Sequence, residues 1–404
     1  MRRETSAITY TSVAHFANDG NLLIFPVLIN YYTALHVDFI ILGFGAMIYN
    51  LISGLVSPFI GRFADRLDKD GLLIFLGIAI QGAALSLFAF AFLHLKQVNE
   101  IVVTGTALFG LGQSVYHPIG GSVLSSAFKG KSSGTLLGVN SSIGSVGRSV
   151  VPLILAALLP LFGITSSLYI IALYEVAASL VVLGGLSTFR RNTIAHRKKP
   201  KKEMQASEKV VPIIYLLMIV IFVRSIFSTG LYTFMPYYFN SILNNNNLVT
   251  EAISAAFLAP VIGQILFGYL TSAWGGKAVV TITSVFAVLS MILLMLTTNF
   301  YLMVILLTLF AFFVFSIFPI LIEYVKELTP QSVSASSNSL VWGVGNTIGG
   351  AVGIGLFALL YRVLNVSLAD SMWVLILIGV VSVVIIPILP RRVRMSGGLS
   401  QTCL

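Results

Sequence analysis

Long, continuously apolar runs dominate this sequence, and each is long enough to cross a lipid bilayer. A helix needs about 20 apolar residues to span roughly 30 Å of hydrocarbon. The runs fall at 8–32, 39–60, 71–93, 101–125, 134–159, 165–188, 211–239, 249–272, 278–297, 300–322, 333–360 and 367–389. Membrane barrel strands are about 10 residues long and alternate in polarity. The pattern therefore predicts an all-α membrane protein with twelve transmembrane helices.

The charge content argues against a soluble protein. Only 9% of the 404 residues are charged, whereas soluble domains carry about 25%. The single cysteine, Cys403, excludes a disulfide within the chain and a cysteine metal cluster. The five histidines lack metal-ligand or nucleophile–base spacing, and no phosphate-binding Gly-x-x-x-x-Gly-Lys-Ser/Thr loop is present. We therefore expect no cofactor, no metal ion, no enzyme activity and no ATP-driven pumping.

The positions of the basic residues predict the orientation in the membrane. If the N-terminus is cytoplasmic, 20 of the 24 Lys and Arg residues fall in inside loops, and only Lys96 and Arg362 fall outside. The other two, Arg148 and Arg224, lie within apolar runs. Cytoplasmic loops carry an excess of Lys and Arg. The sequence therefore predicts a multi-pass plasma-membrane protein with both termini in the cytoplasm, and the net charge of +10 needs no nucleic-acid partner.

One long polar segment divides the chain into two sets of six runs. This segment, 190–210, is basic, and we expect it to be a cytoplasmic linker held near anionic lipid. The predicted domains are an N-terminal six-helix bundle at 1–189, a C-terminal six-helix bundle at 211–390 and a cytoplasmic tail at 391–404.

The two halves resemble each other in sequence. Gly112–Pro118 and Phe313–Pro319 occupy equivalent runs, 201 residues apart. At the same offset, Gly144 matches Gly345. Duplicated six-helix halves are typical of one large class of secondary transporters. The repeat therefore predicts two pseudo-symmetric bundles.

The loop after the second run carries a charged motif. It reads Gly61-Arg62-Phe63-Ala64-Asp65-Arg66-Leu67-Asp68-Lys69, which resembles the cytoplasmic signature of the major facilitator superfamily, Gly-x-x-x-Asp-Arg-x-Gly-Arg. Asp68 replaces the second glycine. Asp65 lies at a helix C-terminus, where its charge opposes the helix dipole and favours ionic partners across the gap. We expect Gly61, Asp65 and Arg66 to form a conformational latch.

Further motifs resemble one branch of that superfamily. They are His15-Phe-Ala-Asn18-Asp19-Gly20, Gly110-Leu-Gly112-Gln-Ser114-Val-Tyr116-His117-Pro118, Gly144-Ser-Val-Gly147-Arg148-Ser-Val-Val-Pro152 and Glu323-Tyr-Val-Lys326-Glu327-Leu-Thr-Pro330. Together they look like the fosmidomycin-resistance type, which are proton-driven drug exporters. This chain has Ile119 where that branch has a glutamate, and Arg148 and Val151 inside the fifth-run motif.

Ionisable groups inside a bilayer are costly, so each one is a functional candidate. The candidates are His15, Asp19, His117, Arg148, Glu175 and Arg224. At 1.5 Å per residue, Asp19, Arg148, Glu175 and Arg224 lie about 16–21 Å from the cytoplasmic ends, near the midplane. In the resembled fold, spans one, four, seven and ten line the cavity. The resemblance therefore implies that His15, Asp19, His117 and Arg224 face it.

Asp19 is the leading candidate for the proton carrier. Burial raises the pKa of a carboxyl, and a nearby cation lowers it. A site that alternates between these two environments can therefore load and release a proton. His15 lies four residues earlier, on the same helix face, and His117 and Glu175 are further proton-coupling candidates. The alternatives are an Asp19 that stays ionised as a packing device and a His117 that is a plain hydrogen-bonded contact.

The substrate-binding candidates are Arg224, Arg148, Asn18, Tyr116, Tyr232 and Asn346. The Arg224 fork matches a carboxylate or phosphate, and its alternative role is as a structural partner of Asp19. Arg148 and Glu175 lie at similar depth on consecutive runs. We predict an intramembrane ion pair between them.

These features favour a proton-coupled exporter of small amphipathic or anionic compounds that works by rocking of two bundles. The first alternative is a proton symporter that imports an organic acid or inorganic anion. The second is a sensor or assembly subunit of transporter fold without flux. The expected partners are a small-molecule substrate, protons and membrane lipid, and we expect a monomer.

Overall fold

The computed structural model describes residues 3–128, 132–190, 201–329 and 337–391, except for the side chains of 65, 125, 132–135 and 201–211. All regular structure in these ranges is helical. The first half contains α1 (Arg3–Gly20), η1 (Asn21–Leu23), α2 (Ile24–Ala34), α3 (Phe39–Leu67), α4 (Asp70–Ala91), η2 (Leu95–Gln97), α5 (Val98–Ala127) and α6 (Ser132–Leu186).

The second half contains shorter and more often broken helices. They are α7 (Lys201–Leu243), α8 (Asn246–Ala256), α9 (Ala259–Trp274), α10 (Gly276–Met295), α11 (Phe300–Val314), α12 (Ile317–Leu328), η3 (Leu340–Ile348), α14 (Gly349–Ala358), η4 (Leu359–Val363), α15 (Leu368–Ile385) and η5 (Ile386–Ile388). The segments η3 and η4 are π-helical. α7 begins in the predicted linker, ten residues before the expected start of the seventh run.

Nine helical segments within the described ranges are long and apolar enough to cross a membrane. One of them, Leu136–Leu186, contains a break at Gly163, where φ is +70° and a side chain would strain the backbone. The expected all-helical membrane fold is confirmed. The number of twelve spans stays a prediction. It requires that this segment be divided at Gly163 and that two further spans be added, one formed by α1, η1 and α2 and the other by α5.

Side-chain caps explain where several helices begin. Asp38 accepts from the Ile40 amide at the start of α3, and Asn245 and Asn299 do the same for α8 and α11. Each cap satisfies one of the backbone N–H groups that the first turn leaves without a helical partner. In a lipid environment, each such unsatisfied backbone group costs on the order of several kcal/mol.

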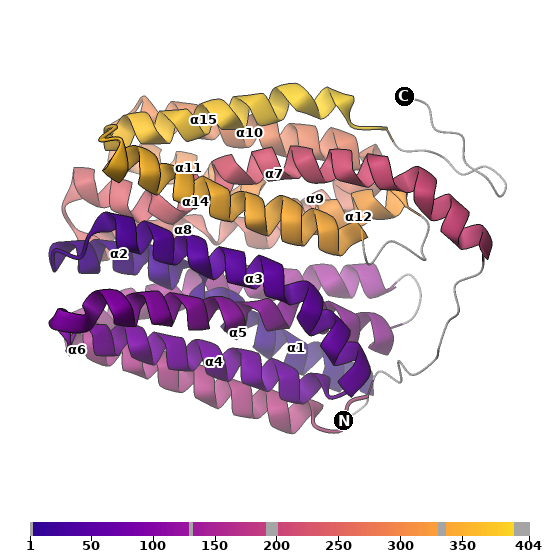
Figure 1. Cartoon of the computed structure of the whole chain (residues 1–404), viewed down its shortest axis with the longest axis horizontal. Coiled ribbons are helices and arrows are strands. Elements are labelled where there is room, and N and C mark those ends of the chain that lie inside the picture. The colour runs from indigo at the N-terminus through magenta and orange to yellow at the C-terminus, as the bar shows by residue number, and fades with distance from the viewer. Residues whose placement is uncertain (1–2, 129–131, 191–200, 330–336, 392–404) are drawn as a thin grey trace.

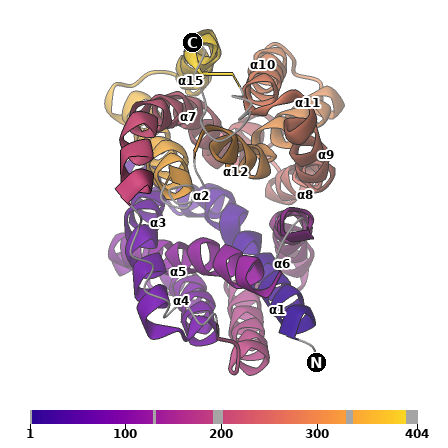
Figure 2. The same ribbon diagram turned by 90° about the vertical axis from the view of Figure 1, so that its right-hand side faces the viewer.

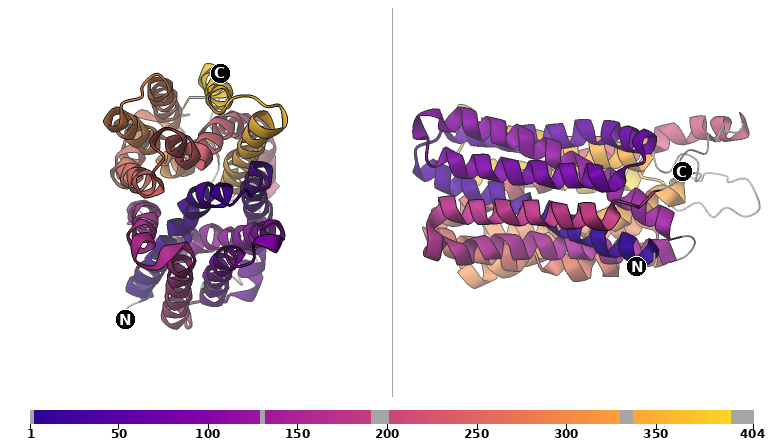
Figure 3. Two further views of the ribbon diagram at one scale, coloured as in Figure 1. Left: turned by 90° about the vertical axis from the view of Figure 1, so that its left-hand side faces the viewer. Right: turned by 90° about the horizontal axis from the view of Figure 1, so that it is seen from below.

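The two halves of the chain form two groups of helices that run along the long axis of the molecule. α1–α6 lie on one side and α7–α15 on the other (Figure 1). The end-on view separates the same two groups (Figure 2). The start of α1 and the end of α15 lie at the same end of the long axis (Figures 1 and 3). The domain limits predicted from the sequence stay a prediction.

Packing within each half is dense, and a smaller set of helices joins the halves. In the first half α1 packs on α6, and α4 packs on α5 and α6. In the second half α7 packs on α14, α15 and η3. The halves meet where α3 contacts α14 and η3, where α2 contacts α7, and where α6 contacts α8 and α9.

An ion pair and an aromatic cluster join the halves at one end. Arg362 donates from Nε to Asp38 Oδ1 at 2.9 Å. Beside this pair, the Phe39 ring lies 5.2 Å from the Phe234 ring and 4.9 Å from the Tyr361 ring, measured between centroids. These residues belong to loops and helix ends that the basic-residue pattern predicts on the outside, so we call this set the outer seam.

Candidate functional site

The Asp19 carboxylate is the centre of a buried charged cluster near the middle of the first half. Its side chain is only 4% exposed and forms an ion pair with Arg148. His15 Nε2 lies 3.2 Å from Oδ2, and His117 Nε2 lies 3.3 Å from Oδ1. Asn18 donates to Oδ1 at 2.9 Å. We call Asp19, His15, His117 and Arg148 the Asp19 cluster.

Three helices bring the cluster together. α1 supplies His15 and Asp19, one turn apart, and its regular helix ends just beyond Asp19 at η1. α5 supplies His117, directly before Pro118, and α6 supplies Arg148. His117 is the most exposed member, with 26% of its side chain accessible against 12% for Arg148. These two side chains are therefore the most accessible part of the cluster.

Gly144 allows α6 to approach α1 at this level. A Cβ atom on it would lie 2.5 Å from both Cδ2 and Nε2 of His15, and 3.0 Å from Asp19 Oδ2. No real Cβ atom could occupy that position without displacing the imidazole. The glycine is therefore required by the packing of the cluster rather than by backbone conformation.

Asn140 and Tyr116 hold the far side of the His15 ring. His15 Nδ1 lies 2.8 Å from Asn140 Oδ1, and the Tyr116 hydroxyl lies 2.9 Å from the same oxygen. The Tyr116 hydroxyl also donates to the Thr11 carbonyl oxygen at 2.9 Å. Tyr116, a predicted substrate-binding residue, is thus buried as a partner of the cluster.

A layer of buried amides lies behind Asp19. Gln81 donates to Asn18 Oδ1 at 2.9 Å, and Gln113 donates to the Asn18 carbonyl oxygen at 2.6 Å. Asn21 donates to Gln81 Oε1 at 3.3 Å. The predicted substrate residue Asn18 therefore belongs to an internal network that fixes the end of α1.

The predicted ion pair between Arg148 and Glu175 is wrong. Arg148 binds Asp19 instead, since α6 places its side chain toward α1. Glu175 is fully buried beside Gly82 of α4, and neither carboxyl oxygen has a hydrogen-bond partner among the described residues. Similar depth on consecutive spans did not predict contact, because the two side chains point into different helix interfaces.

Arg224 lies in the second half and does not join the Asp19 cluster. Its Nε donates to Ser284 Oγ at 3.1 Å, and Nη2 donates to the Phe313 carbonyl oxygen at 3.4 Å. Its side chain is buried, and no carboxylate lies within ion-pair distance of it in the described part of the chain. The alternative role as a partner of Asp19 is therefore wrong.

Two other predicted substrate residues lie in the second half. Tyr232 is buried, and its ring centroid lies 5.1 Å from that of Phe315. The Arg148 guanidinium lies over the same Phe315 ring at 5.3 Å, so Phe315 links Tyr232 to the cluster. Asn346 lies in η3, where its carbonyl oxygen accepts from Ser225.

The predicted latch is described only in part. Gly61 and the exposed Arg66 lie in the last turns of α3, and a Cβ on Gly61 would lie 3.5 Å from Pro118 Cβ. The Asp65 side chain lies outside the described residues. Its role stays a prediction.

The cluster has the ligand types of a metal site but a charge that opposes one. Ligand atoms of His15, Asp19 and His117 lie within 4.8 Å of one another. Two imidazoles and a carboxylate suit a transition metal. The Arg148 guanidinium, however, already pairs with the same carboxylate and would repel a divalent cation. The arrangement therefore suits proton exchange better than metal binding.

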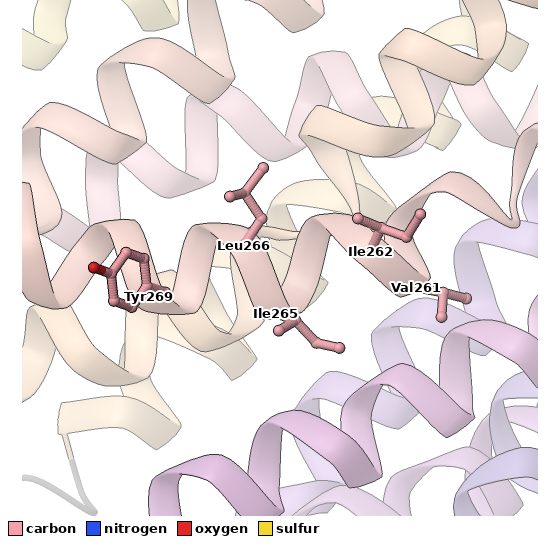
Figure 4. A pocket seen from close by; sticks show the side chains of 5 residues that line it. All are labelled: Val261, Ile262, Ile265, Leu266 and Tyr269. Carbon is pink, nitrogen blue, oxygen red and sulfur yellow. The ribbon is translucent and has the colours of Figure 1, made fainter.

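An apolar groove lies along α9. Its volume is about 380 Å³, and it is lined by Val261, Ile262, Ile265, Leu266 and Tyr269 (Figure 4). All but Val261 are strongly exposed, as expected of a helix face turned toward lipid. With a single phenol as its polar group, the groove is a poor site for orienting a polar substrate.

Sequence reasoning missed four polar partners of the cluster: Asn140, Gln81, Gln113 and Ser145. Gln264 of α9 donates to Ser145 Oγ at 2.7 Å, and Arg148 lies 3.5 Å from the same hydroxyl. Asn140 lies eight residues before Arg148 on the same helix, and this spacing of polar residues was a usable signal for it. Uncharged amides carry less cost in a membrane than charges, so an amide within an apolar run is a weaker signal of function than a charge.

The fold and site define a multi-pass helical membrane protein of two bundles with a buried charged cluster. The sequence matches the family model described as Major Facilitator Superfamily over residues 11–353 and 217–401. The chain belongs to this family of membrane transporters, so the expected family is confirmed.

Two similar proteins agree with this assignment. The fosmidomycin resistance protein of Escherichia coli (strain K12) is 24% identical over 364 residues, which cover 86% of this chain and 85% of that protein. This similarity confirms the resemblance found in the motifs. A bacterial homologue of the human lysosomal transporter Spinster, solved in an inward-facing and unoccupied conformation, shares the fold with a TM-score of 0.71 at 13% identity, covering 96% of both chains.

Proposed function

We propose that this transporter is a proton-coupled exporter of small amphipathic or anionic compounds and that the Asp19 cluster is its proton-binding site. The bundles would rock about the cluster in alternating access. One observation carries the proposal: a buried carboxylate contacts two imidazoles and a guanidinium where α6 meets the second half. Histidine is the side chain whose ordinary titration range includes physiological pH.

The contact between Arg148 and Phe315 supports a role in transport. It joins the charged cluster of the first half to a helix end in the second half. A change in charge at Asp19 would alter the position of Arg148, because the pair would lose its attraction. Proton binding would thereby be felt across the interface between the halves.

Two cationic groups at the accessible edge of the cluster support an anionic or amphipathic substrate. Arg148 can bind a carboxylate or phosphonate with its fork, and His117 adds positive charge when protonated. Tyr232 and Phe315 provide an apolar surface on the opposite side. Arg224, in contrast, is a substrate candidate only if the second half rearranges, since it is buried between α7, α10 and α11.

The direction and location rest on similarity and on charge. The name of the fosmidomycin resistance protein supports export. The excess of Lys and Arg in the predicted inside loops supports a plasma-membrane protein with cytoplasmic termini. Gly61, Asp65 and Arg66 would act as the cytoplasmic latch, and the protein would work as a monomer in contact with lipid.

Transport by the purified protein in liposomes tests the proposal. A pH gradient is imposed, and a panel of phosphonates, organic acids and drugs is screened for movement against the proton gradient. We expect at least one compound to be moved by the wild type, with Asp19→Asn reduced to the level of empty liposomes. Glu100→Gln, which removes an exposed acid in the first turn of α5 outside the outer seam, serves as control. Movement of the compound together with protons would instead identify an importer.

A further inference from the structure

His117 and Phe318 occupy matching positions in the two halves and lie against each other. Each directly precedes a proline, and the sequence repeat places them 201 residues apart. Their ring centroids are 6.1 Å apart, although His117 belongs to α5 and Phe318 to α12. Matching residues of two halves that are related by a twofold axis touch each other only close to that axis. This ring contact therefore lies where the two bundles face each other, at the interface where transporters of this architecture bind their substrates.

The prolines that follow these two rings show that the positions also match in three dimensions. A Cβ on Gly61 would lie 3.5 Å from Pro118 Cβ, and a Cβ on Gly268 would lie 3.6 Å from Pro319 Cβ. Each glycine lies six residues before the last residue of its helix, α3 or α9. The same contact between helices is thus built twice. The halves share this frame and differ in the ring that it carries, which is an imidazole in the first half and a phenyl group in the second.

Trp342 of η3 contacts both rings. Its ring lies 4.7 Å from that of Phe318, at an interplanar angle of 78°, and 6.3 Å from that of His117. It stands in a π-helical segment, where Thr347 Oγ1 donates to the Trp342 carbonyl oxygen at 3.2 Å. Segments of this kind are frequent at functional sites. All three rings are half-buried although they face one another between the halves, and we call them the ring triad.

A guanidinium lies beside the ring triad. His117 Nε2 lies 3.3 Å from Asp19 Oδ1, and Arg148 pairs with the other oxygen of the same carboxylate. Arg148 Nε has no hydrogen-bond partner among the described residues, so this donor is left to be used. A guanidinium matches the oxygen atoms of a carboxylate or phosphonate. The first half therefore offers an anion-binding group next to aromatic faces of the second half.

We propose that the ring triad binds the aromatic ring of an organic anion whose acidic group is held by Arg148, so that Phe318 and Trp342 determine specificity. The inference rests on the proposed function and names the substrate class of the same site, which is aryl carboxylates and aryl phosphonates. The edge-to-face arrangement of Phe318 and Trp342 presents both a face and an edge to a third ring, and aromatic rings prefer such contacts. Aliphatic anions of the same charge lack this contact.

Binding to the purified full-length protein in detergent, measured by isothermal titration calorimetry, tests this preference. Phenylphosphonate is compared with methylphosphonate, and benzoate with acetate, because each pair shares its acidic group and differs in the ring. We expect the ring-bearing member of at least one pair to bind the wild type about ten-fold more tightly than its partner. If neither ring-bearing anion binds more tightly, including the case of no binding at all, the inference is overturned.

Two substitutions in the ring triad should remove the preference without removing the anion site. Trp342→Leu and Phe318→Leu should each lower the ratio of affinities to about two-fold or less, whereas the affinity for the methyl compound should stay as in the wild type. That retained affinity shows that the variant is folded. Trp274→Leu, the same substitution at the exposed end of α9, is the matched control and should keep the full ratio. An unchanged ratio in both triad variants, or an equal fall in Trp274→Leu, would contradict the assignment.

Liposome transport separates this inference from the proposed function. If the preference and its loss in the variants occur as expected but the wild type shows no proton-linked flux, the proposed function fails and the ring site stands. If wild-type flux is proton-linked but is equal for the phenyl and methyl compounds, and remains equal in Trp342→Leu, the proposed function stands and the inference fails.

Discussion

Gly144 and Arg148 lie one turn apart on α6, and each faces Asp19. The glycine leaves the space that the His15 ring occupies, and the arginine supplies the charge that Asp19 requires in a low-dielectric interior. Burying one charge without the other would be strongly destabilising. The cluster therefore depends on the shape and on the charge of a single helix face.

Gly144→Ala should displace His15 from Asp19. The added methyl would overlap the imidazole, and overpacking of this kind typically costs about 1–3 kcal/mol. We expect a lower melting temperature in detergent together with loss of proton-linked flux. Gly138→Ala on the same helix is the matched control, because no atom lies within 4 Å of its added Cβ. Equal effects of the two variants would contradict the role given to Gly144.

Arg148 and Glu175 should differ sharply when each is neutralised. Arg148→Met leaves Asp19 without its guanidinium, and breaking a buried ion pair costs about 3–5 kcal/mol. Glu175→Gln removes a carboxyl that has no hydrogen-bond partner in the described structure, so its melting temperature should stay the same or rise. Thermal unfolding in detergent compares the two variants. An equal loss of melting temperature in both variants would contradict the pairing of Arg148 with Asp19 instead of Glu175.

The ionisable members of the cluster could be predicted from the sequence, but their partners could not. A charge within an apolar run is visible without a structure, which is why His15, Asp19, His117 and Arg148 were candidates. Which charge meets which depends on the rotation of each helix about its axis. That rotation is set by small contacts such as Gly147 against the backbone of Phe16, which a single sequence does not reveal.

At the scale of elements, the start of α3 combines a cap with a link to the other half. The Asp38 side chain accepts from the Ile40 amide and from Arg362. These two donors, the amide first, hold the pKa of the Asp38 carboxyl below its usual value of 3.8. The folded protein therefore gains stability from ionised Asp38 above that value and loses it as the pH falls toward the lower folded pKa.

Asp38→Asn should reveal this dependence. Asparagine keeps the cap but removes the charge, so the variant should melt slightly below the wild type at neutral pH. The difference should be small because the side chain is 44% exposed. It should shrink as the pH falls below the ordinary carboxyl pKa and vanish below the lower pKa of the folded protein. Melting curves across pH test this, with Asp38→Ala as the variant that loses the cap as well. A difference that grows in acid would have the wrong sign.

The apolar runs predicted where helices lie but not where they break. The first run is interrupted at η1, directly after Asp19, and the run near 333–360 contains the π-helical η3 and η4. The apolar pattern carries no mark of such turns, which within helices often lie at functional or strained positions. The break at Gly163 within α6 does have a local signal, since its positive φ favours glycine.

At the scale of the whole molecule, the two halves carry different buried polar contacts. Asn21 contacts Gln81 in the first half, and Arg224 contacts Ser284 in the second. The first half carries the acidic centre, Asp19, whereas the second carries an arginine. A duplicated scaffold with unlike charges suits a transporter in which one half binds the proton.

A cross-link across the outer seam tests the rocking motion. In Asp38→Cys/Arg362→Cys, made in a Cys403→Ser background, a short cleavable bis-maleimide should join the halves. We expect flux to stop on cross-linking and to return when the linker is cleaved, because the outer ends must part to release substrate. Each single-cysteine variant treated with the same reagent is the control. Undiminished flux in the joined protein would contradict the alternating movement of the halves.

Proton movement driven by substrate tests the central claim most directly. Liposomes containing the purified protein and an internal pH indicator receive a gradient of a transported compound without any pH gradient. The wild type and Glu100→Gln should change the internal pH as the compound moves in exchange for protons, whereas Asp19→Asn should not. An equal pH change with Asp19→Asn would show that coupling does not depend on the buried cluster.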